Sequence, residues 1–133
     1  HFYQCNPEHA RGDANMEIRR AKYVSLYGIK GEYSQPIVAV RDSDHIRLFG
    51  YGGNASAAPG SALFAVSDTP NFLATNLVDS PRFPGDGAPE HFAGEGVDPR
   101  TWNMLIERRG DQEIRTEPLD RPVLYQRGAP RAP

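Results

Sequence analysis

The feature that most constrains the fold is an internal repeat centred on residues 37–54, IVAVRDSDHIRLFGYGGN. The segment that begins 22 residues earlier aligns with it without a gap, so that Ile18 matches Val40 and Gly28 matches Gly50. A third copy follows 26 residues later and places Val66 on Val40. Periods of about 20 to 50 residues are typical of chains built from stacked structural units.

Each copy contains a short segment in which apolar and polar residues alternate, as in Ile46-Arg47-Leu48. Alternation with a period of two predicts a half-buried strand whose apolar side chains face one core. Gly28, Gly50 or Asn76 follows this segment in the three copies, and these residue types tolerate a left-handed backbone. The sequence therefore predicts the same turn geometry in every copy.

Strands and bends that recur in this way, with no helical apolar period between them, predict an all-β fold. We expect a short parallel β-solenoid of about three coils, each of which covers the core of the next. A β-sandwich is the alternative, because short strands at regular spacing also suggest that fold. Three coils are near the minimum for stability, so we expect a partner at the N-terminal end: another copy of the chain or further upstream coils.

Composition narrows the functional classes. The length of 133 residues predicts a single domain, and 13 Gly with 12 Pro suit a loop-rich β protein. A net charge of −2 without a basic run argues against nucleic-acid binding. No apolar stretch approaches the ~18 residues of a membrane span. Cys5 is the only cysteine, so no intrachain disulfide can form.

The single domain, residues 1–133, divides into four segments. Residues 1–15 are expected to form an N-terminal loop, 16–80 the coils, 81–99 a Pro- and Gly-rich connector, and 100–133 a cap and tail. Asp98 and Pro99 resemble an N-cap and a first-turn proline, which predicts a short helix from Arg100 to Glu107. A last strand is expected at residues 123–125. The chain begins at His1 without an initiating Met, which suggests a removed leader or a piece of a longer chain.

Residues 15–56 and 98–128 resemble the C-terminal end of bacterial pectate-lyase-like proteins related to glycoside hydrolase families 28 and 55. The GIKGE and FGYGGN turns and the DRPVLYQRG tail carry this resemblance. It implies a right-handed parallel β-helix with a cap. It also implies a secreted or periplasmic, carbohydrate-active module, part of a polysaccharide-degrading glycoside hydrolase that acts on β-glucan or a pectin-like polymer.

Residues 28–36 are similar to the segment that holds the proposed general acid of family 55 β-1,3-glucanases, with Glu32, Gln35 and Pro36 matching. The resemblance implies that Glu32 acts as general acid and that Gln35 contacts the substrate. Glycoside hydrolysis needs a second carboxylate about 5 to 9.5 Å away. Candidates are Asp44, Asp42, Glu8 or a residue in upstream coils. The alternative is that Glu32 is a solvated loop carboxylate.

Three aromatic residues follow the predicted strands: Tyr27, Phe49 and Tyr51. They are candidate substrate-binding residues because aromatic rings stack on sugars, although they can equally stack on one another. Asp42 and Asp68 share one repeat position. They predict either an acidic ladder, together with Asp44, or turns in which aspartate bonds its own backbone.

A third possibility involves copper. If His1 is the mature N-terminus, its amino group and imidazole can chelate Cu(II) together with His9, His45 or His91, as in lytic polysaccharide monooxygenases. Otherwise His1 marks only a processing boundary and no cofactor is expected. Three hypotheses therefore remain: a glycosidase without cofactor, a non-catalytic polysaccharide-binding or assembly module, and a copper-dependent oxidase.

Overall fold

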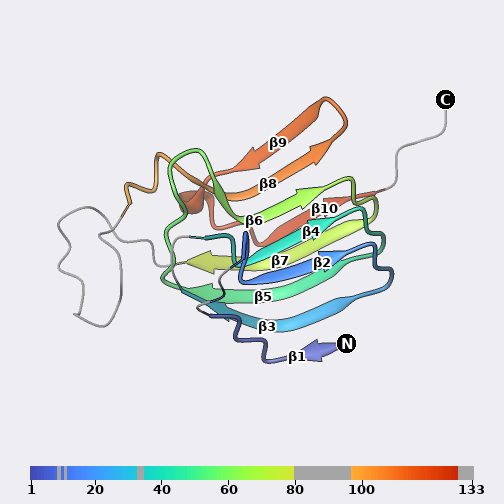
Figure 1. The fold of residues 1–133 in the computed structure, drawn as a ribbon. Helices are drawn as coiled ribbons and strands as arrows, with labels where there is room; N and C mark the ends of the chain where they lie inside the picture. Colours follow the sequence, from blue (N-terminus) through green and yellow to red (C-terminus); the bar gives the residue numbers. More distant parts are fainter. Residues whose placement is uncertain (9, 11, 33–34, 80–96, 129–133) are drawn as a thin grey trace.

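The computed structural model describes residues 1–8, 10, 12–32, 35–79 and 97–128, and it is all-β (Figure 1). Two five-stranded, mostly parallel sheets make up the fold, and successive strands from β1 to β8 alternate between them. The first sheet has the order β1 (Phe2–Tyr3), β3 (Ser25–Gly31), β5 (Arg47–Gly53), β7 (Phe72–Asp79) and β10 (Leu124–Arg127). The second has the order β2 (Met16–Arg19), β4 (Val38–Arg41), β6 (Ala62–Ser67), β8 (Asn103–Arg109) and β9 (Gln112–Thr116).

The strand register follows the sequence repeat. In the second sheet Val40 pairs with Ile18 on one side and with Val66 on the other. In the first sheet Leu48 pairs with Leu26 and with Ala74 in the same way. The alignment at 22 and 26 residues is therefore confirmed, and equivalent residues of successive copies lie on neighbouring parallel strands.

The repeated left-handed backbone is confirmed as well. The φ angle is +64° at Gly28, +76° at Gly50 and +51° at Asn76, inside β3, β5 and β7. Each of these strands bends there, so that Leu26 and Ile29 of β3 both face the interior although they are three residues apart. The corners between the sheets repeat too, with positive φ at Arg20, Asp42 and Asp68 and again at Tyr23, His45 and Asn71.

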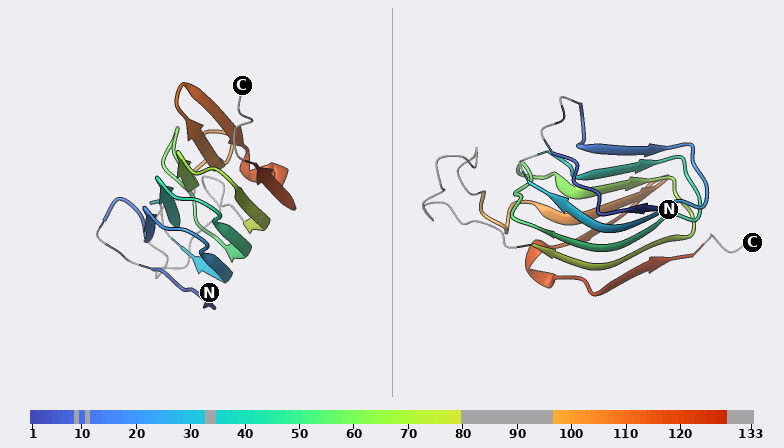
Figure 2. Two further views of the ribbon diagram at one scale, coloured as in Figure 1. Left: turned by 90° about the vertical axis from the view of Figure 1, so that its right-hand side faces the viewer. Right: turned by 90° about the horizontal axis from the view of Figure 1, so that it is seen from below.

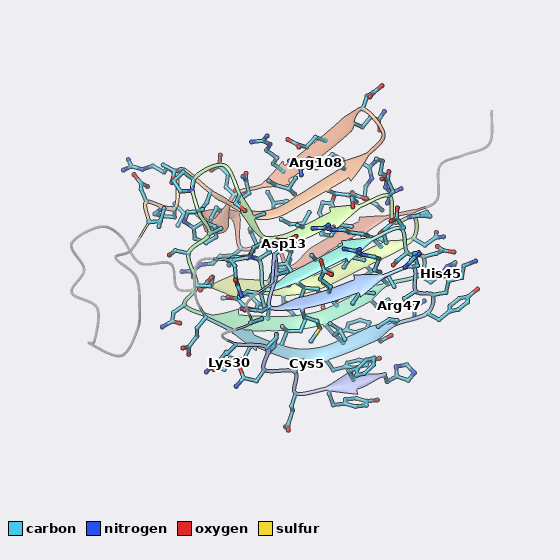
Figure 3. All side chains as sticks on the ribbon, in the orientation of Figure 1. Cys5, Asp13, Lys30, His45, Arg47 and Arg108 are labelled. Carbon is cyan, nitrogen blue, oxygen red and sulfur yellow. The ribbon has the colours of Figure 1, made fainter. Side chains whose placement is uncertain are left out.

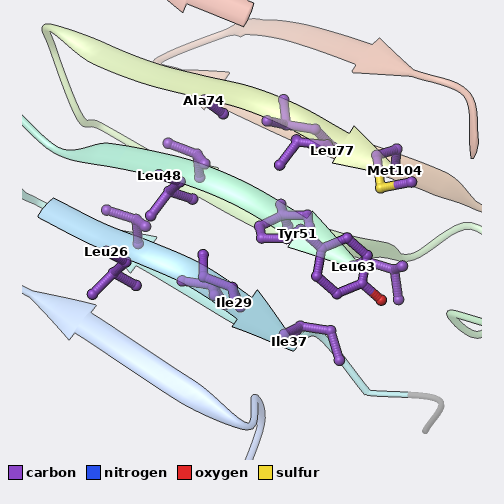
Figure 4. Close-up of a cluster of buried hydrophobic side chains, with 14 of the residues drawn as sticks. Leu26, Ile29, Ile37, Leu48, Tyr51, Leu63, Ala74, Leu77 and Met104 are labelled. Atoms are coloured by element: carbon purple, nitrogen blue, oxygen red, sulfur yellow. The ribbon is translucent and has the colours of Figure 1, made fainter. Parts of the chain in front are cut away.

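The core lies between the two sheets and consists of columns of equivalent residues (Figure 4). One column contains Ile29, Tyr51 and Leu77, all almost completely buried. Burial of a side chain of this size stabilises the fold by about 1.5–3 kcal/mol. Since every column is shared between neighbouring strands, each strand depends on the next one in its sheet for the burial of its side chains.

The predicted helix at residues 100–107 is wrong, because this region enters β8. Asp98 does cap a turn: its carboxylate accepts a hydrogen bond from the Arg100 backbone N–H at 3.0 Å. The Thr101 N–H then bonds the Asp98 carbonyl at 2.9 Å, and the turn ends there. Residues 102–107 are all buried, and β8 pairs with β6. A helix with one apolar face would bury only part of this segment.

The cap consists of two strands joined by a single 3-10 turn, η1 (Pro118–Asp120), instead of an α-helix and a strand. β9 returns antiparallel on β8, and β10 lies antiparallel on β7, so both parallel sheets end in an antiparallel strand (Figure 1). The predicted last strand is β10. The expected N-terminal loop contains the short strand β1, and most of the expected connector lies outside the described residues. No helix in the described part of the chain has the length and apolar character needed to cross a membrane.

Candidate functional site

A row of side chains crosses the outer face of the first sheet, one from each strand. The strand register brings Tyr27 beside Tyr3 and Phe49, and Thr75 beside Phe49 and Leu124. The rings of Tyr3 and Tyr27 stack with centroids 4.9 Å apart, and those of Tyr27 and Phe49 with centroids 4.8 Å apart. We call these five residues the aromatic row, after the three rings among them: Tyr3, Tyr27, Phe49, Thr75 and Leu124.

Stacking decides what the aromatic row presents to a ligand. The interplanar angles are 13° and 11°, so neighbouring rings cover each other's faces and their edges point away from the sheet. Ring edges carry partial positive charge, whereas ring faces carry partial negative charge. The row is therefore better suited to contact oxygen atoms than to stack on sugar rings, except at Tyr3, which is 68% exposed.

A shallow pocket of about 280 Å³ lies beside the aromatic row. Phe49 belongs to both, and β10 forms one wall because it returns antiparallel on β7. Arg47 is exposed, and no described carboxylate lies within ion-pair distance of it. The residues that line the pocket are His45, Arg47, Phe49, Asn71, Phe72, Leu73, Gln126, Arg127 and Gly128.

Asp44 organises the rim of this pocket. Its Oδ1 accepts a hydrogen bond from Asn71 Nδ2 at 3.0 Å and lies 2.9 Å from His45 Nδ1, without the alignment of a hydrogen bond. The Asn71 bond, followed by the contact with His45, lowers the pKa of Asp44 below its usual value. The ring of Tyr23 packs on that of His45 at 4.7 Å. These contacts hold the imidazole beside Arg47 (Figure 3).

A buried carboxylate supports the β10 wall. Glu107 of β8 accepts hydrogen bonds from Arg109 Nε and from the Tyr125 hydroxyl, both at 2.5 Å, and lies 3.6 Å from Arg127 Nε. Burial, followed by the bond to Glu107, raises the pKa of Tyr125 above its usual range. The cluster ties β8 of the second sheet to β10 of the first, and so positions Arg127 at the pocket.

The structure does not bring the predicted catalytic pair together. Glu32 directly follows β3, whereas Asp44 forms an isolated backbone β-bridge with Lys22, which precedes the same strand. The seven-residue strand β3 therefore separates the two carboxylates by a distance of about 20 Å, at ~3.3 Å per residue. In Figure 3 Lys30 and His45, which neighbour these two residues in the sequence, lie at opposite ends of the strands. This distance exceeds the ~5 to 9.5 Å of a hydrolytic carboxylate pair.

Glu32 has a different acidic neighbour, Glu8. Both carboxylates lie 2.8 Å from Lys30 Nζ, so their bound oxygens are at most twice that distance apart. The bonds to Glu32 and then Glu8 raise the pKa of the Lys30 ammonium above its usual value. Lys30 thus holds two acidic side chains at the end of β3.

Two of the predicted substrate-binding residues serve the fold in this structure. Gln35 Nε2 donates to the Ala10 carbonyl at 2.9 Å and to Asn15 Oδ1, which fastens the N-terminal segment. A sugar contact was expected to place Tyr51 on the surface, but its side chain is buried and the residue is only 4% exposed. Its hydroxyl donates to Asp79 Oδ2 at 3.1 Å, and burial raises its pKa above the usual range. Its inward direction follows from the bend at Gly50.

The remaining predicted sites are the copper site at His1 and the acidic ladder of Asp42 and Asp68. His1 is exposed with its ring centroid 6.0 Å from that of Tyr27, and His9 lies outside the described residues. Among the described residues, no three His, Cys, Asp or Glu side chains are grouped closely enough to hold a metal ion. Asp42 and Asp68 occupy left-handed corners, with φ of +49° and +44°.

Sequence patterns missed the two arginines of the pocket. Arg47 lies in an alternating strand and has the pattern of an ordinary exposed residue. The basic residues of the DRPVLYQRG tail indicate a positive charge near the C-terminus, but not that Arg127 folds back beside Arg47. No protein-family model, curated protein or solved structure matches this chain.

Proposed function

We propose that this chain is a short right-handed parallel β-helix module of a secreted or periplasmic carbohydrate-active protein, and that it binds a polysaccharide on the outer face of the first sheet. The parallel pairing of β2, β4, β6 and β8, together with that of β1, β3, β5 and β7, supports the β-helix. Alternation of the chain between the sheets makes each pair of strands one coil.

The observation that carries the binding function is the aromatic row with the pocket beside it. Five strands at ~4.8 Å spacing give a strip of about 19 Å, long enough for several sugar units of an extended chain. Ring edges and the guanidinium of Arg47 favour oxygen atoms and carboxylates. An acidic, pectin-like polymer therefore fits this face better than a neutral glucan.

The test is calorimetric titration with polygalacturonate and with a neutral β-glucan. We expect tighter binding of the acidic polymer and a loss of about tenfold in affinity for Arg47→Gln, since charge-assisted hydrogen bonds contribute about 1.5 kcal/mol or more. Arg115→Gln on β9, a similarly exposed arginine, is the matched control and should leave binding unchanged. Tyr27→Ala should weaken binding and Tyr27→Phe should preserve it. Equal affinity for all four variants would refute the proposal.

Glycoside hydrolysis is the second candidate, because Glu8 and Glu32 approach each other. It is less well supported, since Lys30 lies between the two carboxylates, where the glycosidic oxygen and a water molecule would have to enter. If the activity exists, Glu32→Gln should abolish the release of reducing sugar from glucan or pectin. Unchanged release would end this candidate and leave the binding proposal untouched.

A further inference from the structure

The two sheets are offset by one strand. Short corners join β2 to β3, β4 to β5 and β6 to β7, so these strands face each other across the core, and the bond from Tyr125 to Glu107 places β10 opposite β8. Of the described strands, β1 and β9 remain without a facing strand, β1 beyond β3 in the first sheet and β9 beyond β8 in the second. Figure 2 shows the N-terminus and the β8–β9 hairpin at opposite ends of the molecule.

Both of these strands carry an apolar side chain that extends a core column. Phe2 pairs with Leu26 and extends the column of Leu26 and Leu48, but it is 57% exposed. Ile114 pairs with Glu107, at the end of the column that contains Ile18, and is only partly buried. Each end of the molecule therefore presents one strand whose inner face is incompletely covered.

We propose that these two ends fit each other and that copies of this chain associate head to tail, with β9 of one copy facing β1 of the next. In this arrangement β9 pairs with β2 of the next copy, and β10 pairs with β1 of the next copy. Because each sheet has five strands, a single shift of five strand spacings, about 24 Å at ~4.8 Å each, produces both pairings.

The core column fixes the register of β9 on β2. It continues from Ile114 to Ile18 of the next copy, and β9 runs antiparallel to β2 because it runs antiparallel to β8. The exposed charged residues of the two edges then lie in two pairs of opposite sign, Glu113 opposite Arg19 and Arg115 opposite Glu17. Opposite charges on directly facing residues stabilise a strand pair. The ion pairs inside each strand persist, because the four charges form an alternating square.

The backbone groups of these two edges match in the same register. Met16 and Arg20 donate their N–H groups toward β4, at 3.0 and 3.1 Å. Residues 17 and 19 alternate with them and so direct their N–H and C=O groups outward. On β9, the two-residue turn makes Arg109 and Gln112 a hydrogen-bonded pair, and the alternation leaves residues 113 and 115 directed outward. Residues that face each other across the contact can therefore bond to each other.

The first sheet fits under the same shift. The column of Leu26 reaches Tyr125 on β10 and continues at Phe2 of the next copy. Tyr3 of the next copy then lies beside Leu124, so the contact covers two apolar residues that are 68% and 61% exposed. Burial of apolar surface of this kind favours association.

The backbone groups of this second strand pair match as well. Gln4 donates its N–H group toward β3 at 2.8 Å, so the preceding residue, Tyr3, directs its backbone groups outward. The Val123 carbonyl accepts a hydrogen bond from β7 at 2.8 Å, so the next residue, Leu124, also directs its groups outward.

Contacts between like ends fit less well. A two-fold contact between two β2 strands would place β3 of one copy where β1 of the other already lies. A two-fold contact between two β9 strands would leave the first sheet interrupted, because β10 ends one strand earlier than β9. The head-to-tail contact does not rest on the polysaccharide function, and none of its four charged residues lines the pocket. Failure of either proposal therefore leaves the other standing.

The test is sedimentation velocity over a series of protein concentrations, with circular dichroism melting to verify that each variant folds. We expect the parent chain to form assemblies that grow with concentration, since a head-to-tail contact that does not close extends without limit. The variant E17K/R19E changes only the β2 edge, and E113K/R115E changes only the β9 edge. Each sets like charges opposite each other and should raise the concentration needed for assembly about tenfold or more.

An equimolar mixture of the two variants provides the control. Each changed edge then meets the complementary changed edge of the other variant, and the unchanged edges also meet, so the mixture should assemble like the parent. A merely structural defect would not be repaired by mixing. The proposal is overturned by a parent chain that stays monomeric, by a mixture that stays monomeric, or by E17K/R19E assembling alone like the parent, which would indicate that like edges meet.

Discussion

At the scale of single residues, Glu107 shows how the apolar interior ends. It pairs with Val66, which itself continues the column of Ile18 and Val40, so a carboxylate takes the place of an aliphatic side chain on β8. The side chain is 1% exposed and is satisfied by Arg109, Tyr125 and Arg127. A buried charge is tolerated only when it is paired in this way.

Substitution of Glu107 should therefore be severe. Glu107→Gln removes the charge that compensates Arg109, whose side chain is 14% exposed, and should cost about 3–5 kcal/mol of unfolding free energy. Glu113→Gln, which breaks exposed ion pairs, should cost at most about 1 kcal/mol. Urea denaturation of both variants measures the difference, and equal costs would show that the Glu107 cluster is not buried in solution.

The buried Tyr51 and the partly buried Tyr125 predict a loss of stability at alkaline pH. The pKa values of Tyr51 and Tyr125 are raised above the usual value of 10.0, chiefly by burial. Their contribution to stability is complete below pH 10. It falls as the pH rises further, because these tyrosines ionise in the unfolded chain before they ionise in the folded one. The double variant Y51F/Y125F should lose less stability between neutral pH and strongly alkaline pH, as followed by urea denaturation at each pH; an identical loss would contradict this assignment.

At the scale of elements, the bend inside β3, β5 and β7 turns an alternating strand into one with two inward residues three positions apart. Gly28, Gly50 and Asn76 supply the left-handed backbone for it. The bend also turns Tyr51 into the core, beneath Gly31 and Gly53, where its hydroxyl reaches Asp79. At Gly53 a side chain would collide with Tyr51, so glycine is required for steric reasons. At Gly50 the space is open, and glycine is favoured because the backbone is left-handed.

This distinction can be tested with glycine variants. At Gly50 a Cβ atom would meet nothing within 4 Å, so Gly50→Ala should cost only the left-handed strain of about 1–2 kcal/mol. Gly50→Asn should cost less, since Asn76 adopts this conformation. At Gly53 a Cβ would collide with the Gly31 carbonyl and the Tyr51 hydroxyl, and Gly53→Ala should cost about 3 kcal/mol or more. Chemical denaturation ranks the three, and a Gly53→Ala variant as stable as Gly50→Ala would refute the packing.

At the scale of the whole molecule, the arrangement is close to one-dimensional. Each strand pairs only with its neighbours in the sheet order, so a central position loses more on truncation than an end position. Ile46 and Val24 occupy equivalent positions of successive copies, but Ile46 is completely buried and Val24 only partly. In the order of the second sheet β2 and β9 are the two outermost strands, and Val24 lies in the coil that begins with β2.

Truncation at these two positions should therefore differ. Ile46→Ala should cost about 2–5 kcal/mol of unfolding free energy, and Val24→Ala clearly less, because Val24 is only partly buried. Urea denaturation of both variants checks this, and a larger cost at Val24 would contradict the difference in burial.

The amino-acid sequence by itself determined the strand register and the left-handed bends, because period-two alternation and the conformational freedom of Gly28 and Gly50 are local properties that recur at a fixed spacing. It also placed Phe49 on the candidate surface. Residues 103–109 form a strand instead of a helix because β6 offers an edge to pair with, and Tyr51 is buried because the bend redirects it. Arg127 meets Arg47 only because β10 returns antiparallel on β7. Pairing partners and side-chain burial depend on contacts between residues distant in the chain, so only the tertiary structure decided them.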